Sequence, residues 1–382
     1  MSKQTITRDV NSARVRAMKT PAWGGPINEG VSQSMLNRYM GCKERFRVYA
    51  IEGLRADIGF NHFLEYGQMW HLCEEYHAAR KDWVTPLAKY AKELCVKYKQ
   101  DQVVINKWYN VCKVQFPIYV KYWEEHNDEK NMVPLLQEQV FDVPYELPSG
   151  RVVRLRGKMD GVDLVTGEGI YLQENKSKSK IDIQSLERQL TCDLQTMMYL
   201  TALKIMINQP DEAFVADEWN NPVVGVRYNV IRRPLSGGAG TIRQRQGSKK
   251  QPPETTSEFY ARLSDVIIES QDEFFERWKV VISGRDYDRF HKEVFVPMLE
   301  NLCDDYEWWE WCKQEGFKAD EVFIGDLRKE QFSHHCPRHY RLPYGVYNVI
   351  MEGGFSEVDN YIATGSTVGL INSKRFFNEL AE

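Results

Sequence analysis

The chain has 382 residues, of which 42% are hydrophobic, so it can bury a substantial core in one large domain or in two or three small ones. Its net charge of −4 excludes a strong overall electrostatic attraction to nucleic acid or to a membrane surface. Any such interaction therefore needs a local cluster of positive charge. No apolar run approaches the roughly 20 residues that a membrane helix needs. The N-terminal residues 1–28 are polar and lack the apolar core of a signal peptide, so we expect a cytoplasmic protein.

The first third of the chain has helical spacing. Ser32 and Ser34 can cap a first helix, in which Leu36, Tyr39 and Met40 recur at helical intervals. Helices are predicted over residues 35–50, 63–80, 86–99 and 101–126.

The pattern then changes to strands and turns. Residues 148–150 and 166–169 carry turn signals, the second of them typical of a hairpin. Strands are predicted over residues 135–143, 151–157, 161–165, 170–176 and 222–231, with a helix over 184–207. This order predicts an α/β fold with a mixed sheet, reached after a helical lead-in.

The region after the last predicted strand is basic. Seven arginines and lysines and no acid lie between Arg227 and Lys250, so residues 232–253 form a candidate DNA-contacting loop, or else a solvated linker. A helix is predicted over residues 257–282. We therefore expect three parts: a flexible tail over residues 1–30, a main domain over 31–300, and an aromatic-rich helical extension over 301–382.

A pair of acids and a lysine lies in the middle of the chain. Glu174 and Lys176 are two apart on a predicted strand, so they share a face, whereas Asn175 points away. Asp160 lies on the preceding strand, so two carboxylates can converge on a hard cation such as Mg²⁺ or Mn²⁺. Lys176 beside them could hold the attacking water or steady charge on a phosphate. Alone, so short a pattern is more often an exposed hairpin with scattered charges.

The predicted helix that follows has a polar stripe. At about 100° per residue, Arg188, Gln195 and Tyr199 fall close to one line, away from the apolar face. That apolar face comprises Leu186, Leu190, Met197 and Leu200. The stripe can bind the phosphate or sugar of a strand over a metal site, although a solvated helix face is the commoner origin.

An upstream helix supplies a histidine. Gly67, His71 and Glu75 are spaced by four and share a helix face, with Gly67 permitting a close backbone approach. A histidine can join two carboxylates around Mg²⁺ or Mn²⁺, although a lone histidine is more often an ordinary core or surface residue. His62 and His77 are nearby competitors without the same pattern.

Four motifs occur in order along the chain: Gly67-x-x-x-His71, Gly157-Lys158-Met159-Asp160, Glu174-Asn175-Lys176 and Gln195-Thr196-Met197-Met198-Tyr199. Together they resemble the RecB-like exonuclease branch of the PD-(D/E)XK nuclease superfamily, and in style its bacteriophage or prophage members. Residues 32–46 also look like the N-terminal segment of that branch. The resemblance covers residues 32–231 and implies a restriction-endonuclease-like core, in which helices flank a mixed central sheet.

The resemblance implies a role for each motif residue. His71, Asp160 and Glu174 would be metal ligands together with the backbone carbonyl of Asn175, and Lys176 would be the catalytic lysine. The implied reaction is phosphodiester hydrolysis by metal-activated water, with no covalent intermediate. The predicted DNA-binding residues are Gln195 and Tyr199 near the scissile phosphate, with Arg188, Arg232, Arg233, Arg243, Arg245, Lys249 and Lys250.

The cysteines and tryptophans carry weaker signals. Some relatives bind an iron–sulfur cluster through four cysteines, and the candidates here would be Cys42, Cys303, Cys312 and Cys336. Their spacing is loose and Cys336 lacks a close companion, so we expect buried or surface thiols instead. The cluster at residues 308–311 could stack on bases, but such clusters more often pack in a core.

We therefore predict a metal-dependent DNA exonuclease in recombination, repair or end-processing, in the cytoplasm of a bacterial or phage-infected cell. A structure-specific endonuclease of the same superfamily, and a non-catalytic DNA-binding protein on this fold, remain alternatives. DNA is the expected partner, with a helicase or single-strand-annealing protein as a further candidate and no membrane. Polarity, strand preference, processivity and oligomeric state do not follow from these residues.

Overall fold

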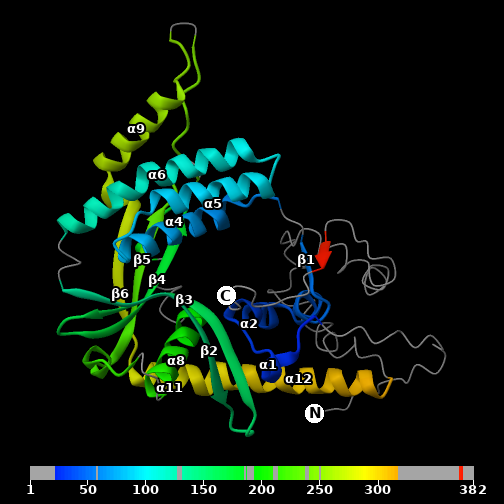
Figure 1. The fold of residues 1–382 in the computed structure, drawn as a ribbon. Helices are drawn as coiled ribbons and strands as arrows, with labels where there is room; N and C mark the ends of the chain where they lie inside the picture. The colour runs from blue at the N-terminus through cyan, green and yellow to red at the C-terminus, as the bar shows by residue number, and fades with distance from the viewer. Residues whose placement is uncertain are drawn as a thin grey trace. The chain divides into compact units, whose positions relative to one another are not determined.

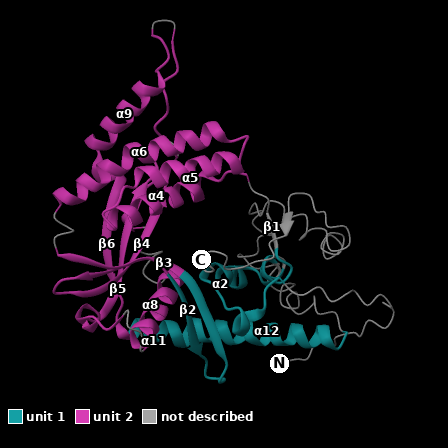
Figure 2. Ribbon diagram, viewed as in Figure 1, with its two compact units in different colours: residues 1–58, 140–157, 285–382 teal, residues 59–139, 158–284 magenta. Residues whose placement is uncertain are grey.

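The protein forms two compact units, each built from separate stretches of the chain. Figure 1 draws the fold of the computed structural model, and Figure 2 colours the two units. Unit 1 comprises residues 1–58, 140–157 and 285–382, and unit 2 comprises residues 59–139 and 158–284. The structure describes residues 22–56, 59–126, 131–184, 186, 193–209, 214–236, 241–248, 251–316 and 370–372.

A five-stranded mixed sheet runs in the order β2-β3-β4-β5-β6. Its strands are β2 (Met132–Glu146), β3 (Val152–Val165), β4 (Gly169–Lys178), β5 (Val223–Arg232) and β6 (Phe275–Val281). Strand β4 is antiparallel to β3 and parallel to β5, while β6 is antiparallel to β5. The parallel pair needs a crossover connection, and the chain between β4 and β5 contains helix α8 (Leu194–Asn208).

Several helices of unit 2 share a core of buried aromatic side chains. Tyr66, Trp70 and Phe116 belong to this cluster, and the rings of Trp70 and Phe116 meet edge to face with centroids 5.2 Å apart. Burial of such rings is the main favourable contribution to packing these helices together. The helices that contribute to this cluster are α4 (His62–Ala78), α5 (Val84–Lys97), α6 (Gln102–Glu125), α9 (Thr256–Glu269) and α10 (Gln271–Phe274), and unit 2 also contains α8 and the 3₁₀ turn η3 (Asp217–Asn220).

Helices cover both faces of the sheet. Neighbouring residues of a strand point to opposite faces, and Tyr228 and Asn229 on β5 reach different helices. The Tyr228 hydroxyl donates to Thr196 Oγ1 on α8 at 3.3 Å. Asn229 Nδ2 donates to Glu74 Oε1 on α4 and to the Tyr119 hydroxyl on α6, at 2.6 Å each. Helix α8 therefore covers one face, and α4 and α6 cover the other.

Unit 1 packs around Trp23, whose side chain is fully buried. Its ring meets those of Phe46 and Tyr306 edge to face, with centroids 5.4 and 5.2 Å apart. Folded chain thus begins before residue 31, where the predicted tail was expected to end. Its elements are α1 (Gly25–Asn28), α2 (Gln33–Gly41), α3 (Lys43–Phe46), the π-helix η1 (Arg47–Ile51), β1 (Leu54–Ala56), α11 (Gly284–Phe290), η5 (His291–Phe295), α12 (Val296–Gln314) and β7 (Leu370–Asn372), which pairs with β1.

Two of the predicted helical ranges contain an extended residue. The helix predicted over residues 35–50 breaks at Cys42, where φ is −169° and ψ is 109°. The helix predicted over 184–207 breaks at Asp193, where ψ is 130°, so α8 begins one residue later. Helical spacing continued across both positions, and a one-residue change of backbone direction leaves no trace in such a pattern.

The prediction of a helix over residues 257–282 is wrong in its second half. Helix α9 is capped by Thr255, whose side chain accepts from the Glu258 backbone N–H while Glu258 bonds back. It ends at Glu269, and residues 275–281 form strand β6. This strand pairs with β5, so sheet pairing overrides the local helical preference.

The mixed sheet with helices on both faces confirms the predicted α/β fold. Within the described ranges, the structure contains no helix with both the length and the apolar character that crossing a membrane requires.

Candidate metal centre

Helix α4 carries His71 and packs against strand β4. Its first turn is capped by Asn61, whose side chain accepts from the Phe63 backbone N–H at 3.0 Å. A Cβ added at Gly67, one turn before His71, would lie 3.8 Å from Ser177 Oγ. This is an ordinary contact distance, so the packing does not itself demand a glycine there. It does show that α4 rests on β4 one turn away from the histidine.

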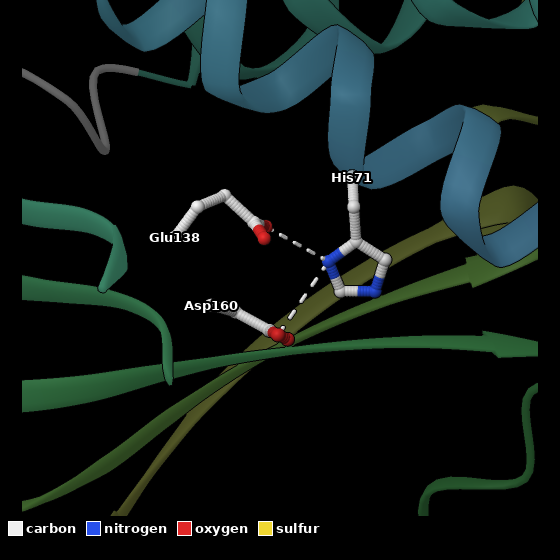
Figure 3. Close-up of side chains that lie close together, drawn as sticks. All are labelled: His71, Glu138 and Asp160. Carbon is white, nitrogen blue, oxygen red and sulfur yellow. Dashed lines mark ion pairs between the residues drawn. The ribbon is translucent and has the colours of Figure 1, made fainter. Parts of the chain in front are cut away.

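His71 meets two carboxylates from neighbouring strands (Figure 3). Its Nδ1 atom lies 3.3 Å from Glu138 Oε1 on β2 and 3.5 Å from Asp160 Oδ1 on β3. Among the described residues, these are the one group of three metal-ligating side chains whose ligand atoms all lie within 4.8 Å of one another. The structure thus brings together His71 and Asp160 from the predicted set, and adds Glu138.

Asp160 lies where the hairpin of β3 and β4 opens. The paired register of the two strands extends to Gly161 opposite Gln173. One residue further, Asp160 Oδ2 accepts a hydrogen bond from the backbone N–H of Asn175 at 2.8 Å. A side chain of β3, rather than its backbone, therefore satisfies this N–H of β4. The Asn175 side chain accepts from Gln173 Nε2 on the α4 and α6 face.

Glu174, Lys176 and Gln195 form a hydrogen-bonded triangle on the α8 face of the sheet. Lys176 Nζ donates to Glu174 Oε1 at 2.5 Å and to Gln195 Oε1 at 2.9 Å. Gln195 Nε2 donates to the same Glu174 oxygen at 2.8 Å. The shared face of Glu174 and Lys176 follows the predicted strand parity. Gln195 fixes both side chains from the first turn of α8.

The second oxygen of Glu174 is a buried acceptor. Glu174 is 1% exposed, and its Oε2 atom has no hydrogen-bond partner within the described part of the chain. Burying a carboxylate oxygen without a partner is costly, so such an atom needs an explanation. A divalent cation supplies one, since Mg²⁺ and Mn²⁺ take carboxylate and carbonyl oxygens, and imidazole is a further ligand for transition metals. The donor set therefore fits a metal ion.

The charges at the site are unfavourable without a cation. Burial and the nearby Asp160 carboxylate raise the pKa of Glu174 to about 7. Burial also raises the pKa of Asp160, with Glu138 adding to the effect and His71 opposing it. Burial lowers the pKa of His71, but the Asp160 and Glu138 carboxylates outweigh it and raise that pKa to about 10. In the metal-free protein, His71 is therefore protonated at neutral pH, and its positive charge offsets the negative charge of the neighbouring carboxylates.

The remaining predicted site residues differ in exposure. Tyr199 is 8% exposed, and burial followed by the charges of Glu174 and Asp160 raises its pKa. The predicted polar stripe is therefore buried at this position, because α8 has buried residues around most of its circumference. Residue 188 lies outside the described residues.

Only part of the basic loop is open to solvent. Arg232 pairs with Glu273 at 2.8 Å, and Arg233 is 7% exposed and donates to the Ser177 carbonyl at 2.5 Å. Arg243 and Arg245 are exposed, on the connection that rises toward α9 in Figure 1. The predicted Lys249 and Lys250 lie outside the described residues.

The described cysteines proposed for an iron–sulfur cluster and the tryptophans of residues 308–311 lie in unit 1. Cys42, Cys303 and Cys312 are buried and do not form a three-ligand group, while Cys336 lies outside the described residues. On α12, Trp309 is 3% exposed and packs in the core. The flanking residues 308 and 311 stack on each other at 4.6 Å between centroids and are 44% and 42% exposed.

Sequence reasoning missed Glu138. It lies within the predicted strand 135–143, but its backbone φ of 48° falls in the left-handed region, which no alternation pattern reveals. Glu74 was missed as well. Glu74 is 8% exposed, and its Oε1 atom accepts a hydrogen bond from the Tyr119 hydroxyl at 2.8 Å. It lies one turn after His71 on α4. The available signal was its i, i+3 spacing from His71.

Comparison with known families agrees with this geometry. No curated protein matches the chain in a sequence search. A family model described as the PD-(D/E)XK nuclease superfamily matches residues 30–313, which include the sheet, helix α4 and every residue of the His71, Asp160 and Glu174 arrangement. The match spans most of the chain, which therefore belongs to the PD-(D/E)XK nuclease superfamily.

Proposed function

We propose that this protein is a metal-dependent DNA exonuclease of the RecB-like branch, of the type found in bacteriophages and prophages. Superfamily membership implies a nuclease that uses divalent metal ions and acts on DNA. The observation that carries the proposal is the Glu174, Lys176 and Gln195 triangle beside Asp160, since it supplies a cation site and a fixed ammonium together. We place its work in recombination, repair or end-processing in the cytoplasm.

The metal ligands in this proposal are His71, Asp160, Glu174 and the Asn175 carbonyl. A bound Mg²⁺ or Mn²⁺ ion would lower the pKa of water and neutralise charge on the phosphate. The protein holds the ligands in place before the ion arrives. The Asn175 N–H orients Asp160, and Gln195 orients Glu174 through the oxygen that does not face the ion.

Lys176 provides the second positive charge of the proposed reaction. Burial lowers its pKa, but the Glu174 carboxylate outweighs this effect and the pKa is raised, so the side chain is an ammonium at neutral pH. An ammonium donates hydrogen bonds and does not accept a proton, so its role is to hold the attacking water and to stabilise phosphate charge. A fixed donor of this kind needs no reorganisation during the reaction.

DNA binding in this proposal rests on exposed cations of the loop before α9. Arg243 and Arg245 are free to reach phosphates, and we assign the same role to Lys249 and Lys250. Arg233 is committed to the Ser177 carbonyl, so its part is to fix the root of the loop to the end of β4. Gln195 and Tyr199 then act on the reacting groups from α8.

The deciding experiment is digestion of end-labelled linear DNA and of closed circular DNA, single- and double-stranded, with Mg²⁺, Mn²⁺ or EDTA. We expect cleavage of linear DNA only, release of label as mononucleotides or short products, and no reaction in EDTA. Cutting of closed circles would replace the proposal by a structure-specific endonuclease. Metal-dependent DNA binding without turnover on any substrate would point to a non-catalytic DNA-binding protein.

A further inference from the structure

Glu138 has a backbone conformation that its residue type rarely adopts. Its φ is 48°, in the left-handed region, although it lies in the middle of strand β2. A glutamate there is strained, and such strain persists when the surrounding structure requires the position. A left-handed residue within a strand redirects its side chain relative to regular alternation. In this chain it directs the carboxylate to His71.

Both oxygens of Glu138 have defined surroundings. Oε2 lies 2.6 Å from Lys158 Nζ on β3. Oε1 lies 3.3 Å from His71 Nδ1, next to Asp160 Oδ1. The Glu138 side chain is 13% exposed, so it is held between these partners and is largely removed from water. Lys158 therefore orients the carboxylate and leaves one oxygen directed at the same point as the histidine nitrogen.

We propose that Glu138 is a further ligand of the metal ion and binds it through Oε1 alone. This inference rests on the proposed function, because it needs the ion that His71, Asp160 and Glu174 would hold. Lys158 acts as its positioning residue, in the way that ligating carboxylates are commonly held by an outer hydrogen bond. The left-handed backbone at Glu138 then serves to bring a third strand's carboxylate to the ion.

The test counts the water molecules on bound Mn²⁺. Electron paramagnetic resonance in ¹⁷O-labelled water is recorded for the full-length protein and for Glu138→Gln, which keeps size and backbone but removes the charge. Calorimetry gives the affinity of each. We expect the variant to bind Mn²⁺ about 10–100-fold more weakly, with about one additional bound water where the carboxylate oxygen was. Glu146→Gln, an exposed position of the same strand, is the matched control and leaves both readouts unchanged.

Each other outcome contradicts a defined part of the inference. An unchanged water count in Glu138→Gln and also in Glu138→Asn, whose side chain is too short to reach the ion, overturns direct ligation by Glu138, whether or not the affinity falls, because a glutamine amide oxygen can itself bind a hard cation. If wild-type protein binds no Mn²⁺, the metal-dependent function itself is wrong. If Glu138→Gln does not fold, as judged by circular dichroism, Glu138→Asn replaces it, because asparagine tolerates left-handed backbone and is too short to restore the ligand. The same gain of one water is then expected.

Discussion

Lys176 Nζ lies 2.5 Å from Glu174 Oε1, and both side chains project from the α8 face of strand β4. The ammonium therefore sits beside the carboxylate that faces the proposed ion. We expect Lys176→Met to lower the single-turnover rate of DNA cleavage by about 10²–10³-fold, because a fixed charge-stabilising donor is lost. Mn²⁺ affinity by calorimetry should fall little. Lys279→Met, which loses a surface pair with Glu168 and a cation–π contact with Tyr171, is the control and should cleave at the normal rate.

Gln195 forms hydrogen bonds with both Glu174 and Lys176. Kinetics can distinguish two roles for it: orienting these two side chains, or binding DNA. If it orients the catalytic side chains, Gln195→Leu lowers kcat about tenfold or more, since a lost hydrogen bond to a charged group costs about 1.5–3 kcal/mol. The KM for DNA should then stay within about twofold of wild type. A raised KM with an unchanged kcat would show instead that Gln195 contributes only to DNA binding. Steady-state kinetics on a labelled oligonucleotide separates the two.

Metal affinity should rise with pH. Burial lowers the pKa of His71, but Asp160, Glu138 and Glu74 outweigh it and raise the pKa to about 10, so the metal-free site carries a proton at neutral pH. A ligand histidine must be neutral, so binding releases that proton. The stability of the metal-free fold changes with pH in the opposite direction. The raised pKa of His71 contributes stability that is fully present below about pH 6.5 and is lost as the pH rises through about 10. Mn²⁺ calorimetry in buffers of different ionisation enthalpy measures the proton release, and no buffer dependence would contradict it.

Arg243 and Arg245 are exposed, so their contribution to DNA binding should appear in the salt dependence. Neutralising one phosphate changes the slope of log K against log salt by about 0.9 for duplex DNA and about 0.7 for a single strand. If each contacts one phosphate, replacing both by alanine should reduce the slope by about 1.8 or about 1.4. The measurement is a binding titration with Ca²⁺ in place of Mg²⁺, and an unchanged slope would make the loop a solvated linker.

The sheet contains a buried ion pair that is linked to the candidate site through Gln173, which hydrogen-bonds to both Arg227 and Asn175. Arg227 NH2 lies 2.5 Å from Asp163 Oδ2, and both side chains are at most 2% exposed. Asp163→Ala should destabilise the protein by about 3–5 kcal/mol, because it leaves a buried guanidinium without its counter-charge. The double variant Asp163→Leu with Arg227→Met should recover much of that loss. Urea unfolding measures both, and equal losses in single and double variants would argue against this account.

Some of the site could be predicted because it depends on local geometry. Strand parity places Glu174 and Lys176 on one face whatever the rest of the fold does, and the structure has them there. His71 and Asp160 could be paired only by resemblance, because they come from a helix and a strand far apart in the chain. The polar stripe on α8 was predicted to lie away from the apolar face and bind DNA, and its burial at Tyr199 was not foreseen because a helical projection does not say which elements cover that side.

Other features were beyond sequence reasoning for identifiable physical reasons. Glu138 depends on one left-handed residue, and glutamate gives no sign of that conformation. Strand β6 was predicted as helix because residues 275–281 fit a helical period as well as an alternating one, and only the pairing with β5 decides between them.

The placement of α4 and α8 on opposite faces of the sheet has a consequence for how activity responds to partial unfolding. Helix α4 supplies His71 and helix α8 supplies Gln195. The sheet together with only one of these helices therefore lacks part of the centre. Local opening of either helix removes a needed group while most of the fold survives. Loss of cleavage in mild denaturant should therefore precede loss of the helical circular dichroism signal. Enzyme turnover would then report local opening of α4 or α8 before the protein unfolds globally.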